Sequence, residues 1–310
     1  MDLDNLWSYM KTYGNTGWED CPTYFDILIP YVLDVLDRLN LKITFFIVGQ
    51  DAAQDKNNDV LKLLTERGHE VGNHSFHHEP WLHMHLKDRI EQEILETEEQ
   101  IIRVTGHKPI GFRGPGFSWS LDLLEVLAEK DYVYDATTFP TYLVPLATAY
   151  YFCNSNLNAE EKNKRKEIRG GLREGMRPIK PYCWKLASGR RLLEIPVTTI
   201  PIIKTPFHLS YLIFLSQFSS NIMLLYLKMA LALCRLTGTE PSFVIHPTDL
   251  LGGDQVPGMR FFPGMDLSAH RKLEIFKRVI KELSRHFTLV NMRFHAESIL
   301  QRNNISIKCP

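Results

Sequence analysis

The sequence predicts one α/β domain whose strands form a barrel-like, mainly parallel sheet. Short apolar runs rich in β-branched and aromatic residues alternate with helical patterns, which is typical of a parallel sheet covered by helices. Counting these apolar runs gives about seven or eight strands. A chain of 310 residues with 44% hydrophobic and 23% charged residues is long enough for one large domain with a sizeable core.

The alternation is clearest in the first 137 residues. The run "KITFFIVG" (42–49) ends in a glycine and predicts a buried strand, while Gly68 and Gly106 stand where two amphipathic patterns end. Ser120 is a candidate N-cap. In chain order we expect a helix over 23–40, a strand at 42–49, a helix over 57–68, a strand at 69–75, a helix over 86–106, a strand and tight loop at 109–116, a helix over 120–130 and a strand at 132–137.

Two predicted insertions, at about 140–189 and 207–238, interrupt this alternation. The first contains a basic run at 160–169, which we interpret as a solvated face. Around the insertions we expect strands at 190–203, 242–247 and 287–292 and a helix over 268–284. The predicted organisation is therefore a single catalytic domain over 1–310 that carries both insertions.

The second insertion is unusually apolar. Residues 209–234 reach about the length of a membrane span, but polar residues interrupt them, so we expect two helices broken near Ser219. Two explanations remain for so much apolar surface: burial against the other insertion, or peripheral docking to a bilayer. In the docked case we expect the lipid tail of a substrate near Phe214, Leu224 and Leu225.

Composition excludes several classes of protein. The net charge is zero, which gives no electrostatic footprint for a nucleic-acid partner. Five scattered cysteines without CxxC spacing argue against a disulfide framework and favour a reducing compartment. The first ten residues lack a charged leader and apolar core. We therefore expect a cytoplasmic protein, with any membrane docking on the inner face.

Chemically reactive side chains stand where four predicted strands end. In a parallel α/β barrel the reactive residues lie just beyond the carboxyl ends of the strands. Two acids, three histidines and one arginine occupy such positions here: Asp2, Asp4, His74, His78, Arg113 and His246.

The spacing of His74 and His78 predicts a metal site. Residues four apart face the same way if the loop forms one helical turn. Two imidazoles and one carboxylate give three ligands with an open fourth position, as in a catalytic zinc site. Asp4 is the candidate carboxylate.

Four stretches resemble the motifs of the polysaccharide deacetylases, carbohydrate esterase family 4, which carry the nodulation-type chitooligosaccharide deacetylase homology domain. They are "TFFIVG", "HEVGNHSFHH", "GFRGPGFSW" and "FVIHP", and the resemblance covers roughly 1–137 and 190–300. It implies an irregular (β/α)7-type barrel. The first motif, "DLD", matches the divergent Asp-x-Asp branch. Because Asp2 directly follows Met1, we expect a truncated first strand and one open sheet edge.

The resemblance also implies a role for each site residue. Asp4, His74 and His78 would bind the divalent metal, most likely Zn²⁺ by its ligand set. Asp2 would be the general base, Arg113 its ion-pair partner and His246 the general acid, and the substrate groove would include Pro115, Gly116 and Trp119. The family's Asp-Trp stretch is missing, and Glu194 or Asp249 could take its place.

The leading functional prediction is a metal-dependent hydrolase that removes an N-acyl group, probably acetyl, from an amino sugar in a polysaccharide, oligosaccharide or lipid-linked glycan. Hydrolysis of a small non-sugar amide or cyclic imide is the first alternative. A non-catalytic metal-binding member of the fold is the second. Paired carboxylates typical of a glycosidase are not evident.

Overall fold

The computed structural model describes residues 1–157, 162 and 172–310. The predicted basic run at 160–169 lies outside the described residues, apart from Lys162. The described strands form one eight-stranded sheet in the order β1-β2-β3-β4-β5-β7-β6-β8. Their bounds are β1 Asp2–Leu3, β2 Thr44–Ile47, β3 Glu70–Asn73, β4 Gly111–Phe112, β5 Tyr134–Asp135, β6 Tyr182–Lys185, β7 Arg191–Glu194 and β8 Ser306–Lys308.

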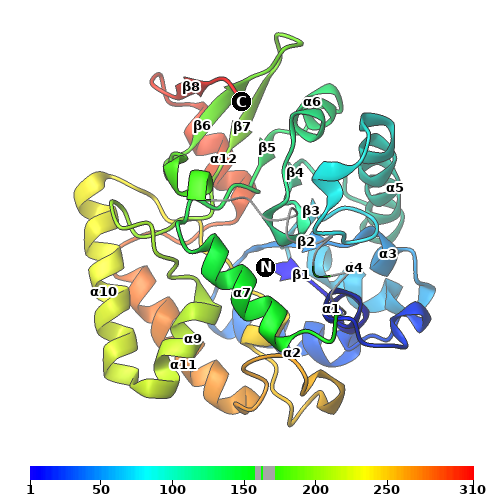
Figure 1. The fold of residues 1–310 in the computed structure, drawn as a ribbon, viewed down its shortest axis with the longest axis vertical. Helices are drawn as coiled ribbons and strands as arrows, with labels where there is room; N and C mark the ends of the chain where they lie inside the picture. The colour runs from blue at the N-terminus through cyan, green and yellow to red at the C-terminus, as the bar shows by residue number, and fades with distance from the viewer. Residues whose placement is uncertain (158–161, 163–171) are drawn as a thin grey trace.

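The first five strands and β7 are parallel, and β6 runs antiparallel to β7. This confirms an α/β fold with a mainly parallel sheet. Because the carboxyl ends of the parallel strands lie together, the loops that follow β1, β3, β4 and β7 gather at one end of the barrel. Figure 1 shows β1 at the centre of the molecule, with the other strands and the helices arranged around it.

Backbone hydrogen bonds close the barrel beside β1. The Asp2 N–H donates to the carbonyl of Ile245 (3.0 Å), and the Thr198 N–H donates to the carbonyl of Ser242 (3.1 Å). β1 has two residues and is an end strand of the sheet, as expected, but the bond from Asp2 to Ile245 covers part of its outer edge. The strand expected at 242–247 is wrong, because this extended segment makes single bonds to two neighbours rather than a regular ladder.

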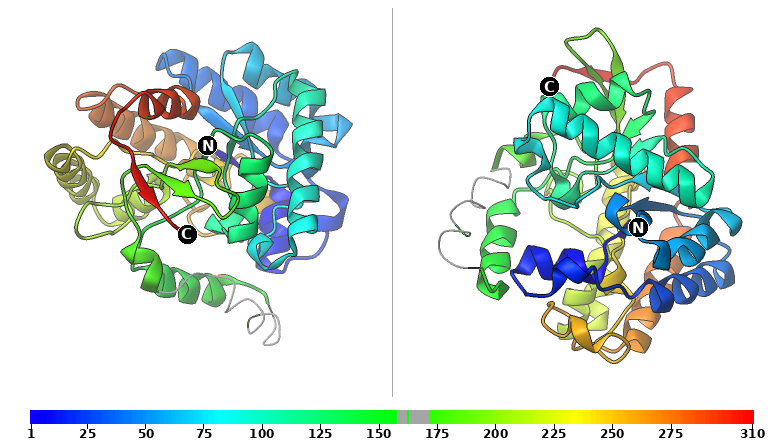
Figure 2. Two further views of the ribbon diagram at one scale, coloured as in Figure 1. Left: turned by 90° about the horizontal axis from the view of Figure 1, so that it is seen from above. Right: turned by 90° about the vertical axis from the view of Figure 1, so that its right-hand side faces the viewer.

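Helices surround the sheet, as two further views show (Figure 2). Their bounds are α1 Leu6–Tyr13, α2 Phe25–Arg38, α3 Gly49–Ala52, α4 Asn58–Glu66, α5 Lys87–Thr105, α6 Leu121–Glu129, α7 Val144–Asn154, α9 Leu209–Phe218, α10 Ser220–Thr237, α11 Ala269–Ser284 and α12 Met292–Leu300. The predicted helices at 23–40, 57–68, 86–106, 120–130 and 268–284 are confirmed. Ser120 and Ser268 cap α6 and α11 with their side-chain oxygens, as short polar N-caps do.

Two elements near the end of the chain differ from the predictions. Residues 287–291 form no strand; Asn291 instead caps α12, its side chain accepting from the Phe294 N–H. The predicted insertion at 140–189 ends in β6, which the sequence analysis missed, and β6 also pairs with the unpredicted β8. The sheet therefore extends beyond the barrel into a three-stranded arm.

The apolar segment at 207–238 forms two helices, as predicted. The chain breaks at Ser219, whose side chain accepts from the N–H groups of Asn221 and Ile222 at the start of α10. By length and composition α10 could cross a membrane, although core helices of soluble proteins meet the same criteria. Here α9 and α10 pack on each other and on α11, with α10 at the outer edge of the molecule (Figure 1).

Candidate active site

A cleft of about 550 Å³ opens at the carboxyl end of the barrel strands. It contains five of the six reactive residues predicted from the sequence: Asp2, Asp4, His74, His78 and His246. Arg113, the sixth, is buried and contacts Asp2 from behind. The topology thus brings together side chains that are up to 244 positions apart in the chain.

Asp4 is presented to the cleft by the short connection between β1 and α1. The next residue, Asn5, caps α1 with its side chain, and the Tyr24 hydroxyl donates to the Asp4 carbonyl at 2.5 Å. These contacts fix the backbone on both sides of the carboxylate. Burial would raise the pKa of Asp4, but the facing histidines hold it well below its usual value, so the group is a carboxylate at neutral pH.

Asp4, His74 and His78 form the one group among the described residues whose donor atoms could jointly hold a metal ion. Asp4 Oδ1 lies 3.3 Å from His74 Nε2 and 3.0 Å from His78 Nε2. In a tetrahedral site with bonds near 2.0–2.1 Å, neighbouring donors stand about 3.3 Å apart. The spacing therefore fits a zinc-sized cation.

Hydrogen bonding also fits a metal at this position. His74 Nδ1 lies 2.5 Å from the Arg113 carbonyl, so Nδ1 carries the proton and Nε2 is left with a lone pair directed at Asp4. Asp4 Oδ1 is buried and accepts no well-aligned hydrogen bond within the described chain. Such a buried acceptor normally has a partner, and a divalent cation would supply one.

The loop that carries both histidines is not the helical turn that we expected. Ser75 and His78 both have positive φ angles, 60° and 49°, and the Ser75 N–H donates to the Asn73 side chain at 2.9 Å. Two left-handed residues, rather than helical spacing, direct both rings to the same point. Non-glycine residues in this region are uncommon and need support from their surroundings.

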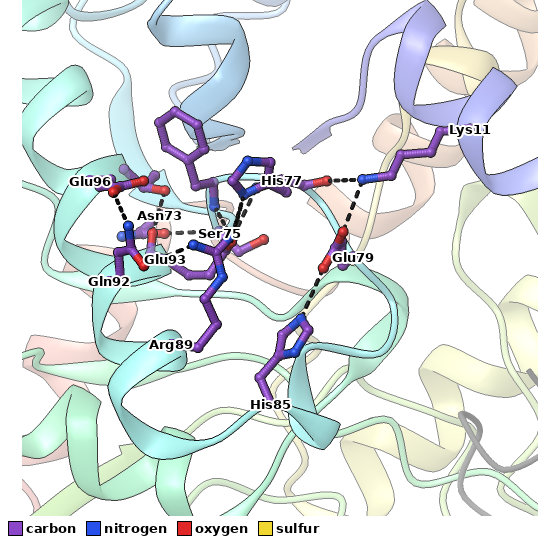
Figure 3. Close-up of polar contacts among 12 residues, drawn as sticks. Lys11, Asn73, Ser75, His77, Glu79, His85, Arg89, Gln92, Glu93 and Glu96 are labelled. Atoms are coloured by element: carbon purple, nitrogen blue, oxygen red, sulfur yellow. Dashed lines mark hydrogen bonds and ion pairs between the residues drawn. The ribbon is translucent and has the colours of Figure 1, made fainter. Parts of the chain in front are cut away.

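Glu93 of α5 supplies much of that support (Figure 3). Its Oε2 accepts the backbone N–H groups of Phe76 and His77, both at 2.9 Å. Its Oε1 lies 2.6 Å from His77 Nδ1 and 2.8 Å from an Arg89 nitrogen. Burial would raise the pKa of Glu93, but these partners lower it. The buried carboxylate thus holds the residues between His74 and His78.

A second set of contacts holds the outgoing end of the same loop. Lys11 of α1 pairs with Glu79 at 3.1 Å, and Glu79 also pairs with His85 at 2.9 Å. Lys11 lies 3.4 Å from the His77 carbonyl as well. Figure 3 shows these contacts on the side of the loop opposite Glu93. The histidine-bearing loop is therefore anchored from both α1 and α5.

Asp2 is paired with Arg113. The Asp2 Oδ1 lies 3.4 Å from an Arg113 guanidinium nitrogen, and both side chains are buried. Burial would raise the pKa of Asp2, but the charge of Arg113 and the nearby histidines lower it below its usual value. Although β1 has only two residues, the ion pair with Arg113 fixes the Asp2 carboxylate and keeps it ionised.

His246 lies across from Asp2 and is backed by Asp249. Its Nε2 is 3.7 Å from Asp2 Oδ2, and its Nδ1 is 3.7 Å from Asp249 Oδ2. Burial would lower the pKa of His246, but Asp249 and Asp2 raise it to about 9. Of the two acids considered from the sequence, Asp249 is therefore the one that pairs with the His246 ring. Glu194 bonds instead to Thr138 and Trp184.

The groove wall is built from the turn after β4. Gly116 has φ 59°, and a Cβ there would lie 3.0 Å from the Pro80 ring, so a side chain would be strained. Gly116 and Trp119 line the cleft, but Pro115 is buried behind it because the turn directs 116–119 outward. The guanidinium of Arg177 sits 3.9 Å over the Trp119 ring.

Sequence reasoning missed several residues that line the cleft. They include His83, in the loop after β3, and His208 and Tyr211, in the segment interpreted as an apolar insertion. Ser210 adds a contact of 3.4 Å to His246 Nδ1. The available signal for His208, Ser210 and Tyr211 was the grouping of one histidine and two hydroxyl residues at the start of an apolar segment.

Fold and site together define an α/β barrel with a candidate metal-hydrolase centre, and comparisons with known proteins give the family. Residues 17–134 match the family model of polysaccharide deacetylase. Over 86 residues the chain is 36% identical to a peptidoglycan-N-acetylglucosamine deacetylase of Bacillus cereus, covering 28% of this chain and 30% of that protein. The match to the family model places residues 17–134 in the polysaccharide deacetylase family.

Two longer matches extend this similarity. A peptidoglycan deacetylase of Helicobacter pylori is 26% identical over 172 residues, covering 52% of this chain and 57% of that protein. A putative polysaccharide deacetylase of Mycobacterium smegmatis, known as a crystal structure, superposes with a TM-score of 0.60 at 17% identity, covering 100% of this chain and 93% of the other. That likeness shows the same fold. The match to this chain covers less than two thirds of the length of the Bacillus cereus and Helicobacter pylori proteins.

Proposed function

We propose that this chain is a metal-dependent N-deacetylase that hydrolyses the amide bond of an acetylated amino sugar. The observation that carries the proposal is the convergence of three metal donors, Asp4, His74 and His78, in one cleft with a buried ion-paired carboxylate and a histidine backed by an acid. Amide hydrolysis of this kind needs a metal site, a proton acceptor and a proton donor, and each of these roles has a candidate side chain.

When bound at the three donors, a divalent cation such as Zn²⁺ would act as a Lewis acid that polarises the amide carbonyl and makes water more acidic. Asp2 would accept the proton of the attacking water, since Arg113 keeps it ionised. His246 would donate a proton from Nε2 to the leaving amine, with Asp249 orienting the ring through Nδ1. General acid and base groups of this kind each contribute about 10²–10⁴-fold.

The named activities of the relatives support the substrate class. They include peptidoglycan deacetylases of Bacillus cereus and Helicobacter pylori and a chitin deacetylase of Colletotrichum lindemuthianum, which is 31% identical over 104 residues. Trp119 on the cleft wall suits a sugar, because an aromatic ring offers an apolar surface to the C–H face of a pyranose.

The experiment is acetate release from N-acetylglucosamine oligomers by protein loaded with Zn²⁺, with Asp2→Asn beside it. Loss of turnover in Asp2→Asn, with metal content unchanged, supports the proposal. A wild-type protein that releases no acetate from sugars but opens cyclic imides or cleaves simple amides supports the alternative substrate class. Metal binding with no turnover in a broad amide screen supports a non-catalytic role.

A narrower proposal concerns the form of the sugar. We propose a lipid-linked glycan, because Tyr211 in the cleft begins an aromatic stripe on α9 that continues to the exposed Phe214 and Phe218. An acyl or polyprenyl chain would bury apolar surface against this stripe, whereas a free oligosaccharide has no apolar chain to place there. A kcat/KM for a lipid-linked N-acetyl sugar no higher than for the free sugar would refute this form of the substrate.

A further inference from the structure

The α9–α10 hairpin exposes apolar side chains that no described residue covers. Phe218 is 72% exposed, Leu225 70% and Leu236 82%, and Phe214, Ile222 and Met229 are also exposed. In contrast Leu224, expected beside them, packs partly into the main core. Exposed apolar residues are common singly, but six on one hairpin are a concentration of the kind that marks an interaction site.

These side chains share one face of α10. Ile222, Leu225, Met229 and Leu236 recur at intervals of three, four and seven residues, which places them along one side of the helix. The opposite side, with Met223, Leu227 and Leu231, is buried in the core. One side of α10 packs in the core and the other faces solvent, and both sides are apolar.

The charges on the hairpin have one sign. Across α9 and α10 the sequence contains Lys228 and Arg235 and no acidic residue, and both basic residues are exposed. An apolar face flanked by basic side chains is typical of helices that lie in the interface of an anionic bilayer, where each basic residue adds attraction. A protein partner that complemented this face would need acidic residues around an apolar centre.

The hairpin is also connected to the active-site cleft. Tyr211 lines the cleft, and Phe214 and Phe218 follow it at three and seven positions on the same helix, so that Phe218 lies about 10 Å further along the axis. Phe214 and Phe218 are in edge contact, with ring centroids 5.3 Å apart. The apolar stripe thus begins at the cleft and ends on the surface.

We infer that the outer face of the α9–α10 hairpin docks in the interface of a membrane with anionic headgroups and places the mouth of the cleft beside the lipid. The inference does not depend on deacetylase activity, because docking needs no turnover. It commits to a bilayer rather than to a second copy of the chain. Location on the inner face of a cell membrane stays a separate proposal.

Flotation with phosphatidylcholine vesicles, with and without phosphatidylglycerol, tests the inference on the full chain. We expect protein to float with the mixed vesicles and less with phosphatidylcholine alone. Phe218→Ser with Leu225→Ser should abolish flotation. Lys228→Gln with Arg235→Gln should weaken binding to anionic vesicles about fivefold per charge removed.

The matched control is Leu121→Ser with Phe294→Ser, a leucine and a phenylalanine that are 57% and 61% exposed elsewhere on the molecule. This pair should float like wild type. Protein that stays at the bottom with both vesicle types overturns the inference. So does a concentration-dependent dimer that the Phe218→Ser, Leu225→Ser pair dissolves, because a second copy would then cover the face.

Discussion

Replacing Glu93 by glutamine should weaken metal binding although Glu93 is not a ligand. The substitution keeps the size of the side chain and removes its charge. The glutamate now receives four donors, two on each oxygen: the N–H groups of Phe76 and His77 on Oε2, and the His77 ring and Arg89 on Oε1. Whichever way the glutamine amide turns, its NH₂ group faces donors that previously had an acceptor.

The expected magnitude follows from these bonds. Hydrogen bonds to a charged group contribute about 1.5–3 kcal/mol each, and a buried donor left without a partner costs about 1–3 kcal/mol. We expect the free energy of unfolding to fall by about 2–4 kcal/mol on that basis. Because the loop also sets the positions of His74 and His78, zinc affinity should fall about 10–100-fold, as for other residues behind metal ligands.

The assay is zinc affinity by competition with a chromophoric chelator, measured beside thermal unfolding. The matched control is Glu70→Gln, since Glu70 is also buried and hydrogen-bonded, but at the opposite end of β3. We expect the control to keep its zinc affinity whether or not its stability falls. A Glu93→Gln protein that binds zinc within twofold of wild type would refute the claim that Glu93 positions the loop.

Three further predictions concern the same site. Asp249, together with Asp2, raises the pKa of His246 to about 9, so activity should fall as pH rises through that value. Asp249→Asn should move this alkaline limit down by about one unit or more. An unchanged pH profile argues against the pairing of Asp249 with His246. Arg113→Met should raise the pKa of Asp2 and move the acidic limit of kcat/KM upward, since the guanidinium favours the ionised form; an unmoved limit would count against that ion pair. Zinc at 100 times its dissociation constant should stabilise the fold by about 2.7 kcal/mol, measured by chemical unfolding, and His78→Ala should abolish that response.

The fold was predictable where one local pattern determined each element. The helices α2, α4, α5 and α11 have strong apolar periodicity and clear ends, and β2 is a β-branched run ended by glycine. The segments at 242–247 and 287–292 look like strands from composition. Their conformation, however, is set by where neighbouring backbone groups lie, and single-sequence patterns do not contain that information.

The candidate site was likewise predictable only where a local sequence pattern indicated the residues. The histidine spacing and the "DLD" and "RGPG" stretches indicated the residues that meet in the cleft. Sequence alone left open whether Glu194 or Asp249 stands behind His246, because the answer depends on the path of the chain after β7. The contribution of Glu93 was invisible for a similar reason, since it acts on backbone N–H groups of a distant loop.

The central claim is that Asp4, His74 and His78 form a catalytic metal centre. The most direct test is anomalous diffraction at the zinc absorption edge from crystals of zinc-loaded protein. We expect one strong peak about 2.0–2.2 Å from the donor atoms of all three residues. A peak elsewhere, or no peak in this cleft at full zinc occupancy of the protein, would contradict it.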